Sequence, residues 1–422
     1  MSLLSQVRSL FEPALAGLVP DRAELAEYLG MVRSTDPKNG DYQANFAMKL
    51  AKQLGRKPLE VAAEVVGMLP PSDAIESATV AGPGFINIKL KDTRLASQVR
   101  AMAAQDRLGV SALEKLRRYV IDYSSPNVAK PLHVGHLRST IIGDALTRLL
   151  RFLGHTVVTD NHLGDWGTQF GMLIYGYRNF LDRAAYDTDP VRELARLYVQ
   201  VRNEIKAAGG GDNEEEANNP VADACRQETA KLHAGDPENV ALWNEFMPHC
   251  LELLHSTYRT LGILKFDYEH GESEYNPMLP GVVEDMLAKG IAEESQGAVV
   301  IPNAKGVIPR TEEEQKKEEP PAILRKRDGA FTYTTSDLAT VKYRVEHFQP
   351  DAMLYVVDFR QGSHFEPLFE MAREWGYNSV EMKHVSFGSV LGEDKKPFAA
   401  RKGGAPELAD LIDEAVKLGR AK

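Results

Sequence analysis

Hydrophobic and polar residues follow two different periods along the chain, and the changes of period divide it into parts. Near the N-terminus, the stretches 59–69 and 93–105 carry apolar residues at helical spacing. Between them, "SATVAGPGFINIKL" (77–90) reads as two short strands joined by a Gly-Pro-Gly turn. This mixture predicts an N-terminal α+β domain over residues 1–112.

A second pattern begins with a β-rich run from Tyr119 to Tyr123, which leads into the loop "SSPN". The following segment gathers its apolar side chains on one helical face, at Leu137, Ile141, Ile142, Leu146, Leu149 and Leu150. Gly154 ends this helix, and "HTVVTDN" (155–161) reads as another strand. Strand, loop, helix and strand form a βαβ unit, which predicts a parallel sheet.

The next residues interrupt this unit. The segment at about 176–265 is strongly helical, and buried-strand patterns resume with "DAMLYVVDF" (351–359) and "HVSFGSVLG" (384–392). We therefore predict an α/β fold, in which a Rossmann-type parallel sheet over residues 113–404 is split by a largely helical insertion. Residues 405–422 read as the start of a C-terminal helical region, and we expect this region to be truncated.

Composition narrows the class of protein. Of the 422 residues, 43% are hydrophobic and 26% are charged, as in a globular protein with sizeable cores. The two cysteines, Cys225 and Cys250, form no CxxC pair, which excludes a cysteine zinc site and suits a reducing cytoplasm. The sequence lacks both a signal peptide and an apolar run of about 18 residues, so we expect a cytoplasmic protein without membrane contact. The net charge of −10 argues against indiscriminate coating of nucleic acid.

The motif "HVGH" (133–136) stands where the predicted helix begins. A metal pair at His133 and His136 is a weak interpretation, because no carboxylate lies between them and no third ligand is evident. Phosphate binding has more physical support, since a helix N-terminus after a parallel strand offers free N–H groups and a positive dipole end. Gly135 permits close approach of a nucleotide, and the imidazoles can donate hydrogen bonds to charge that develops on an α-phosphate.

Taken with its surroundings, this motif resembles the HIGH signature of class I aminoacyl-tRNA synthetases. "SPNVAKPLHVGHLRSTIIGD" resembles the arginyl-tRNA synthetase family specifically, and the resemblance covers nearly the whole chain. It continues through "GDWGTQ" (164–169), "YTTSDLA" (333–339), "YVVDFRQGSHF" (355–365) and "FGSVLGEDKKPFAARKGG" (387–404), and in the N-terminal part through "GDYQANFAMKLAK" (40–52) and "GPGFINIKL" (82–90).

The resemblance implies an arginine pocket. Tyr333 and Asp337 are four residues apart at a predicted helix start, so they can share a face, and a carboxylate can accept a guanidinium bidentately. In the resembling family the matching Tyr and Asp hold the arginine side chain together with a Gln, which is Gln361 here. Asp122, Asn127 and Gln169 match further positions near the substrate. Two simpler interpretations stay open: Asp337 caps its helix, and Asp122 staples the loop after its strand.

The second class I signature, KMSKS, is where this sequence departs from the pattern. The aligned loop is "KKPFAARKGG" (395–404), in which Lys395, Lys396 and Arg401 remain candidate ATP contacts. Family members with such a degenerate loop tend to carry a lysine just before HIGH, and Lys130 stands there. The resemblance thus implies that Lys130 supplies the charge for the pyrophosphate, whereas solvated loop lysines are the simpler interpretation of Lys395 and Lys396.

As a whole, the resemblance implies ATP-dependent activation of L-arginine, with Mg²⁺ accompanying ATP, and transfer to tRNA(Arg). We expect no protein-bound metal, a monomer, and tRNA contacts by the N-terminal domain. Basic residues clustered in sequence could contribute to such a surface: Arg94, Arg100, Arg107, Lys115, Arg117 and Arg118. Two alternatives remain, namely a small-molecule nucleotidyltransferase, which also uses an HxGH helix start, and a non-catalytic RNA- or partner-binding paralogue.

Overall fold

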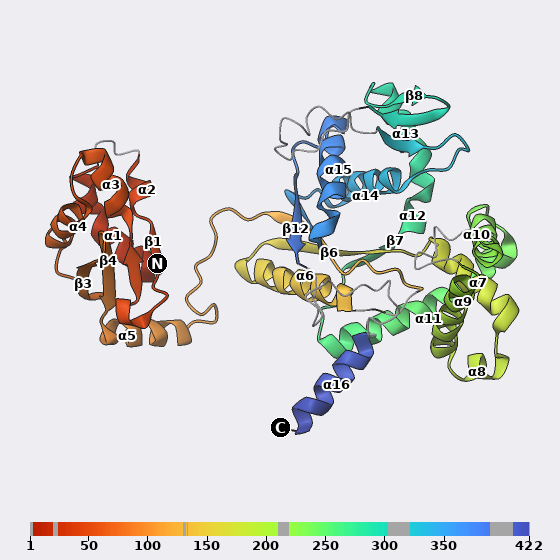
Figure 1. The fold of residues 1–422 in the computed structure, drawn as a ribbon, viewed down its shortest axis with the longest axis horizontal. Helices are drawn as coiled ribbons and strands as arrows, with labels where there is room; N and C mark the ends of the chain where they lie inside the picture. Colours follow the sequence, from red (N-terminus) through yellow and green to blue (C-terminus); the bar gives the residue numbers. More distant parts are fainter. Residues whose placement is uncertain are drawn as a thin grey trace. The chain divides into compact units, whose positions relative to one another are not determined.

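The computed structural model describes residues 3–19, 24–129, 132, 134–209, 219–302, 321–388 and 408–421. The chain divides into two compact units, residues 1–113 and residues 114–422, and each has its own hydrophobic core. Figure 1 shows the elements of both units.

The first unit is a four-stranded antiparallel sheet covered by helices. Its sheet has the order β1-β2-β4-β3. Ile86, Ile88 and Leu90 alternate along β4 and are buried against the helices, as the period of two requires. The elements are α1 (Leu3–Ala16), α2 (Leu25–Tyr28), β1 (Met31–Arg33), η2 (Pro37–Asn39), β2 (Tyr42–Ala44), α3 (Phe46–Leu54), α4 (Pro58–Gly67), β3 (Ile75–Ala81), β4 (Phe85–Leu90) and α5 (Asp92–Ala103).

The second unit is built on a five-stranded parallel sheet of order β12-β11-β5-β6-β7, which confirms the predicted Rossmann-type fold. The order reverses between β5 and β11, because the chain builds outward through β6 and β7 and then returns to the other side of β5. The strands and the helix that joins the first two are β5 (Arg118–Asp122), α6 (Val134–Leu153), β6 (Thr156–Leu163), β7 (Tyr268–Gly271), β11 (Ala352–Asp358) and β12 (Glu381–Phe387).

Both faces of this sheet are buried. Ile121 of β5 lies in the hydrophobic core on the α6 side of the sheet. Its neighbour Val120 lies in the core on the opposite side, which includes residues of α13 (Leu279–Ala288), α14 (Tyr333–Phe348) and α15 (Gly362–Trp375). Strands buried on both faces have continuous apolar sequences, and this explains why "YVID" and "AMLYVV" carry no polar alternation. The C-terminal helix α16 (Leu408–Ala421) joins the α6-side core through Leu408 and Ile412.

Helices occupy most of the chain between β6 and β7, as the helical insertion predicted: α7 (Thr168–Phe180), α8 (Arg183–Thr188), α9 (Pro190–Ala207), α10 (Pro220–His233) and α11 (Pro237–Leu261). Between β7 and β11 lies a three-stranded antiparallel sheet that the sequence pattern did not predict. The elements of this connection and of the following crossover are α12 (Glu272–Tyr275), η3 (Asn276–Met278), α13 (Leu279–Ala288), β8 (Glu293–Ser295), β9 (Ala298–Ile301), β10 (Ala322–Arg325), α14 (Tyr333–Phe348), η4 (Phe359–Gln361) and α15 (Gly362–Trp375).

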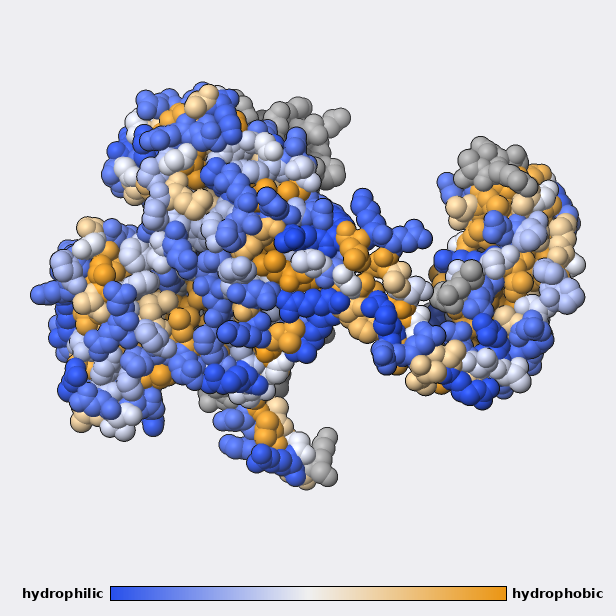
Figure 2. All heavy atoms as spheres, turned by 180° about the vertical axis from the view of Figure 1, so that it is seen from behind, coloured by the Kyte–Doolittle hydropathy of each residue, from blue (hydrophilic) through white to orange (hydrophobic). Residues whose placement is uncertain are grey.

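Hydrophilic side chains cover most of the face seen in Figure 2, and hydrophobic ones are scattered among them in small groups. Within the described ranges, no helix is both long enough and apolar enough to cross a membrane. Cys225 and Cys250 are both buried and unpaired, and burial raises the pKa of each thiol to about 12.

Candidate active site

The carboxyl ends of β5 and β11 meet where the strand order reverses, and open α/β sheets bind ligands at such a point. Asp122 is the last residue of β5, and η4, which ends at Gln361, follows β11 directly. The hydroxyl of Ser139 on α6 donates to the carbonyl of Val356 in β11 over 2.5 Å. The helix that follows β5 is therefore fixed to the strand on the other side of the reversal.

Two successive serines after β5 have left-handed backbone conformations, with φ of 71° at Ser124 and 46° at Ser125. Such conformations cost about 1 to 3 kcal/mol each in non-glycine residues and persist only where surrounding contacts impose them. The Ser124 N–H donates to Ser139 Oγ over 2.9 Å, and the Ser125 N–H donates to Asn161 Oδ1 over 3.0 Å. Ser124 and Ser125 thus form a constrained turn directly after the strand, and strain of this kind is typical of a ligand-binding loop.

Helix α6 follows this turn in the sequence, begins at Val134 and runs for 20 residues. Gly135 is exposed and His136 is half-buried, in the first turn of the helix. The first N–H groups of a helix lack intrahelical acceptors, so this end carries a partial positive charge. The geometry suits an anion such as a phosphate. Lys130 and His133 lie outside the described residues, as do Lys395, Lys396 and Arg401.

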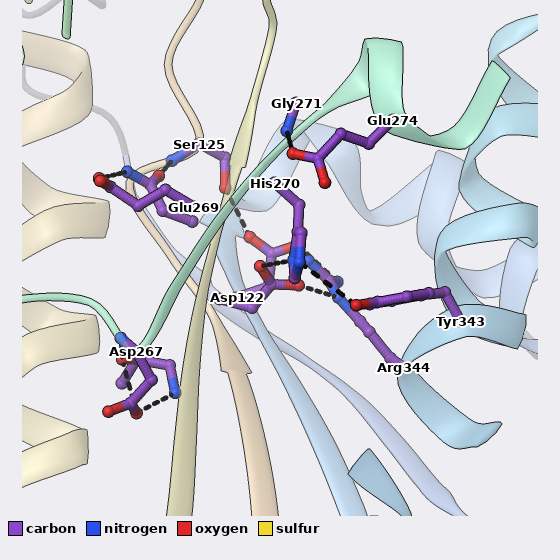
Figure 3. A network of polar contacts seen from close by, with 12 residues as sticks. Asp122, Ser125, Asp267, Glu269, His270, Gly271, Glu274, Tyr343 and Arg344 are labelled. Carbon is purple, nitrogen blue, oxygen red and sulfur yellow. Dashed lines mark hydrogen bonds and ion pairs between the residues drawn. The ribbon is translucent and has the colours of Figure 1, made fainter. Parts of the chain in front are cut away.

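Below the constrained turn lies a buried ionic network that links three strands to α14 (Figure 3). Arg344 is fully buried, and its guanidinium donates to Asp122 Oδ2 and to Asp160 Oδ2, each over 2.8 Å. His270 Nδ1 lies 2.9 Å from the second oxygen of Asp160. The other oxygen of Asp122 accepts a 2.5 Å hydrogen bond from Ser125 Oγ. Asp122 therefore joins the constrained turn to Arg344.

The network keeps its charges although it is buried. Burial alone would raise the pKa of Asp160, but the charge of Arg344 and the hydrogen bond with His270 outweigh it and lower this pKa to about 2. Burial likewise opposes the charge on Arg344, yet the two aspartates hold its pKa well above the ordinary value. The site thus contains fixed charges whose positions are set by mutual pairing.

The start of α14 presents the predicted guanidinium-binding pair. The helix begins at Tyr333, so Tyr333 and Asp337 are one turn apart, with Tyr333 67% exposed and Asp337 half-buried. Asp337 is not the N-cap, a position that Thr332 holds. Its Oδ2 instead lies 2.8 Å from Nε2 of His364, in the first turn of α15. This contact joins α14 to the helix that follows Gln361, itself exposed.

Of the remaining predicted residues, Asn127 lies in the loop that follows β5, and Gln169 lies at the start of the helix that follows β6. Asn127 is exposed and forms an isolated parallel bridge with Gly164, while Gln169 is buried in the first turn of α7. Asp165 is buried and accepts from the N–H and the hydroxyl of Ser273 over 2.9 and 2.6 Å. The motif "GDWGTQ" therefore holds Asn127 and Gln169 on one framework.

Several basic residues of the expected tRNA surface have partners inside their own unit. Arg117 pairs with Glu381 over 2.7 Å, and Arg94 donates to Gln6 over 2.5 Å. Arg107 donates to the carbonyl of Val110 over 3.3 Å. These contacts give the three arginines structural roles, whatever they also bind.

Sequence reasoning missed Asp160, Arg344 and His364. Arg344 lies seven residues after Asp337, hence two turns along the same helical face, and His364 stands inside the motif "YVVDFRQGSHF". Helical periodicity could therefore have pointed to Arg344, but no local pattern pairs it with carboxylates 222 and 184 residues away. Among the described residues, no group of three or more His, Cys, Asp or Glu is arranged to hold a metal ion.

Comparison with known proteins agrees with this geometry. Residues 98–422 match the family model of the class I tRNA synthetase (R) catalytic domain, and residues 5–90 match that of the arginyl tRNA synthetase N-terminal domain. An arginine–tRNA ligase of Rhodopirellula baltica is 40% identical over all of this chain, which spans 72% of that protein. One of Escherichia coli is 44% identical over 90% of this chain, and the match spans 63% of that protein.

Solved structures share the fold. The arginyl-tRNA synthetase of Thermus thermophilus superposes with a TM-score of 0.71 at 22% identity, covering all of this chain and 70% of its own. That of Plasmodium falciparum gives a TM-score of 0.69 at 24% identity, covering 98% of this chain and 67% of its own. The two family models, whose matches extend over most of the sequence, and the 40% identity with the Rhodopirellula baltica ligase establish that the chain belongs to the arginyl-tRNA synthetase family, within class I of the tRNA synthetases.

Proposed function

We propose that this chain activates L-arginine with ATP and transfers the arginyl group to tRNA(Arg). The observation that carries the proposal is the position of α14: its first turns hold Tyr333 and Asp337, and its buried Arg344 is tied through Asp122 to the loop before the HVGH helix. The proposed guanidinium site and the proposed phosphate site therefore share one connected framework, and this supports the proposal. The relatives' name, arginine–tRNA ligase, supports the same reaction.

The proposed reaction needs no protein nucleophile. A carboxylate oxygen of arginine attacks the α-phosphorus of ATP, which enters with Mg²⁺, and pyrophosphate leaves. A hydroxyl of the terminal ribose of tRNA then attacks the carbonyl carbon of arginyl-adenylate, and AMP leaves. The protein contributes positioning and stabilisation of developing charge.

Roles follow from chemistry and position. Asp337 accepts the guanidinium and Tyr333 lies beside it, since both stand on one helical face. Gln361, Asn127, Gln169 and Asp122 complete the proposed arginine site. Both oxygens of Asp122 already have protein partners, Ser125 and Arg344. Within the arginine site we therefore propose that Asp122 holds the turn at Ser125 in position.

The ATP site is proposed at the start of α6. Gly135 and His136 stand in its first turn, and a helix N-terminus favours negative charge. His133 and Lys130 complete this site as catalytic residues, and Lys395, Lys396 and Arg401 reach the outer phosphates. We further propose that residues 1–112 contact tRNA, that residues 113–404 carry the catalysis, and that the chain acts as a monomer in the cytoplasm.

ATP–pyrophosphate exchange tests the reaction. We expect exchange that depends on arginine, measured with and without tRNA(Arg), because activation in this family generally requires bound tRNA. Lys130→Ala should depress exchange far more than it weakens arginine binding, whereas Lys289→Ala, which removes an exposed ion pair with Asp285, should change neither. Exchange driven by another acid would favour the nucleotidyltransferase alternative. Absence of exchange under every condition would contradict the proposal.

A further inference from the structure

His364 is the one member of the α14–α15 contact that the proposed reaction does not yet use. Its Nε2 lies 2.8 Å from Oδ2 of Asp337, and both side chains are partly open to solvent, with exposed fractions of 39% and 27%. The imidazole therefore occupies one oxygen of the carboxylate that a guanidinium would approach. A carboxylate has about four acceptor positions, so it can accept from both partners at once.

Among the charged and titratable groups that the structure describes near His364, Asp337 is the one that contacts its ring. On the β11 side, Asp358 is paired with Arg360 over 2.7 Å. On β12, His384 packs against Phe365 and its Nε2 lies 3.0 Å from the carbonyl of Val357. On α15 itself, Glu366 is two residues further along. The hydrogen bond with Asp337 and the charge of that carboxylate raise the pKa of His364, against partial burial, which lowers it.

We propose that His364 positions Asp337 for the guanidinium of arginine, and that a proton on His364 competes with arginine for this carboxylate. The inference rests on the proposed function. With one proton, on Nε2, the neutral ring donates to Oδ2 and fixes the plane of the carboxylate. With both nitrogens protonated, the ring adds a positive charge beside the one that the substrate brings.

The sign of the pH effect follows from linkage. Arginine brings a positive charge to Asp337, so it lowers the pKa of His364, and the bound complex holds fewer protons. Coupling is reciprocal, so raising the pH through the pKa of His364 must strengthen arginine binding. The folding stability of the free protein depends on pH in the opposite direction. Because the pKa of His364 in the folded protein is above the ordinary 6.5, the contribution of His364 to stability is present at low pH and is lost as the pH rises through that pKa.

Equilibrium dialysis with labelled arginine, at saturating tRNA(Arg) and without ATP, measures this coupling. From about pH 8 to about pH 6, we expect the affinity of the wild-type protein to fall by roughly threefold to tenfold. His364→Gln places a neutral N–H donor near the position of Nε2, and its affinity should become independent of pH. His347→Gln is the matched control, because His347 is exposed at the opposite end of α14, and this variant should keep the wild-type profile.

A second measurement needs no variant. In an NMR titration of the histidine rings, the resonance assigned to His364 should report a pKa above 6.5 that falls when arginine is added. A wild-type affinity independent of pH, or a His364→Gln variant that retains the wild-type pH dependence, would overturn this inference and leave the proposed function standing. A wild-type protein that binds no arginine at any pH would overturn both.

Discussion

Arg344 has no contact with solvent, yet it carries a charge that two aspartates balance. Its guanidinium bonds to Asp122 at the end of β5 and to Asp160 within β6, and both aspartates are far from it in the sequence. A single side chain thereby fixes the distance between α14, where Asp337 stands, and the strand that leads to the constrained turn. Removing one member of a buried ion group leaves the others unpaired, which costs far more than losing an exposed pair.

Replacing Arg344 tests this arrangement. Arg344→Met should destabilise the protein by about 3 to 5 kcal/mol at neutral pH, because two buried carboxylates lose their counter-ion. The Asp160 carboxyl has a pKa of about 2 in the folded protein and near 3.8 in the unfolded chain. Its contribution to stability is therefore present above about pH 4 and is lost as the pH falls through 2. The deficit of the variant should therefore shrink as the pH is lowered, as measured by urea unfolding across that range.

Lys342→Met on the same helix is the control for this prediction. Lys342 pairs with Glu346 over 2.9 Å at a partly exposed position, so its loss should cost about 1 kcal/mol or less. If both variants lost the same free energy of unfolding, Arg344 would not be a fixed charge of the site.

At the scale of the element, α6 packs unusually close to β5. A Cβ added at Gly143 would overlap the ring and Cβ of Tyr123, which is fully buried beside the end of β5. Gly143 therefore stands in the middle of a long helix, where glycine is ordinarily unfavourable, because only a missing side chain lets the helix approach. The approach also determines where the N-terminus of α6, with Gly135 and His136, lies over the sheet.

Gly143→Ala tests that packing. An extra methyl group in a close-packed core forces shifts that cost about 1 to 3 kcal/mol, and here it should also slow ATP–pyrophosphate exchange by moving the start of α6. Gly281→Ala is the matched control: Gly281 lies in α13 with open space around it, and alanine should be neutral or stabilising by up to about 1 kcal/mol. Thermal unfolding and exchange rates of both variants measure the difference. A harmless Gly143→Ala would contradict the close approach.

Much of the site's scaffold follows from local sequence patterns. The strands β5, β6 and β11 and the helix α6 were predicted because apolar periodicity and flanking turn residues are local signals. The small sheet β8–β10 was not predicted, because its three- and four-residue strands are too short to show alternation. The left-handed backbone at Ser124 and Ser125 also escaped, since serine rarely adopts it and the contacts that impose it come from Ser139 and Asn161. Tertiary contacts, not propensity, shape the turn.

On the scale of the whole molecule, the two compact units have separate cores. The buried residues of the first core all lie between Val7 and Leu90, whereas the buried residues that the structure describes in the other two cores lie at Val120 or later. Charge and hydropathy averaged over the chain hide this division, so the prediction of an N-terminal domain over residues 1–112 rested on the local apolar pattern alone. The first unit has the length of an ordinary domain, whereas the second, which contains the helical insertion, is longer.

We therefore expect residues 1–113 to fold when expressed alone, because their core needs no side chain from the rest of the chain. The fragment should show a cooperative thermal transition and a dispersed NMR spectrum. Residues 1–82 form the control, since this shorter fragment lacks β4 and with it Ile86, Ile88 and Leu90 of the core, and should remain unfolded. Residues 114–422 should bind arginine with the same pH dependence as the whole chain. If either unit collapses without the other, the cores are not independent, and the assignment of tRNA contact and arginine binding to separate domains fails with them.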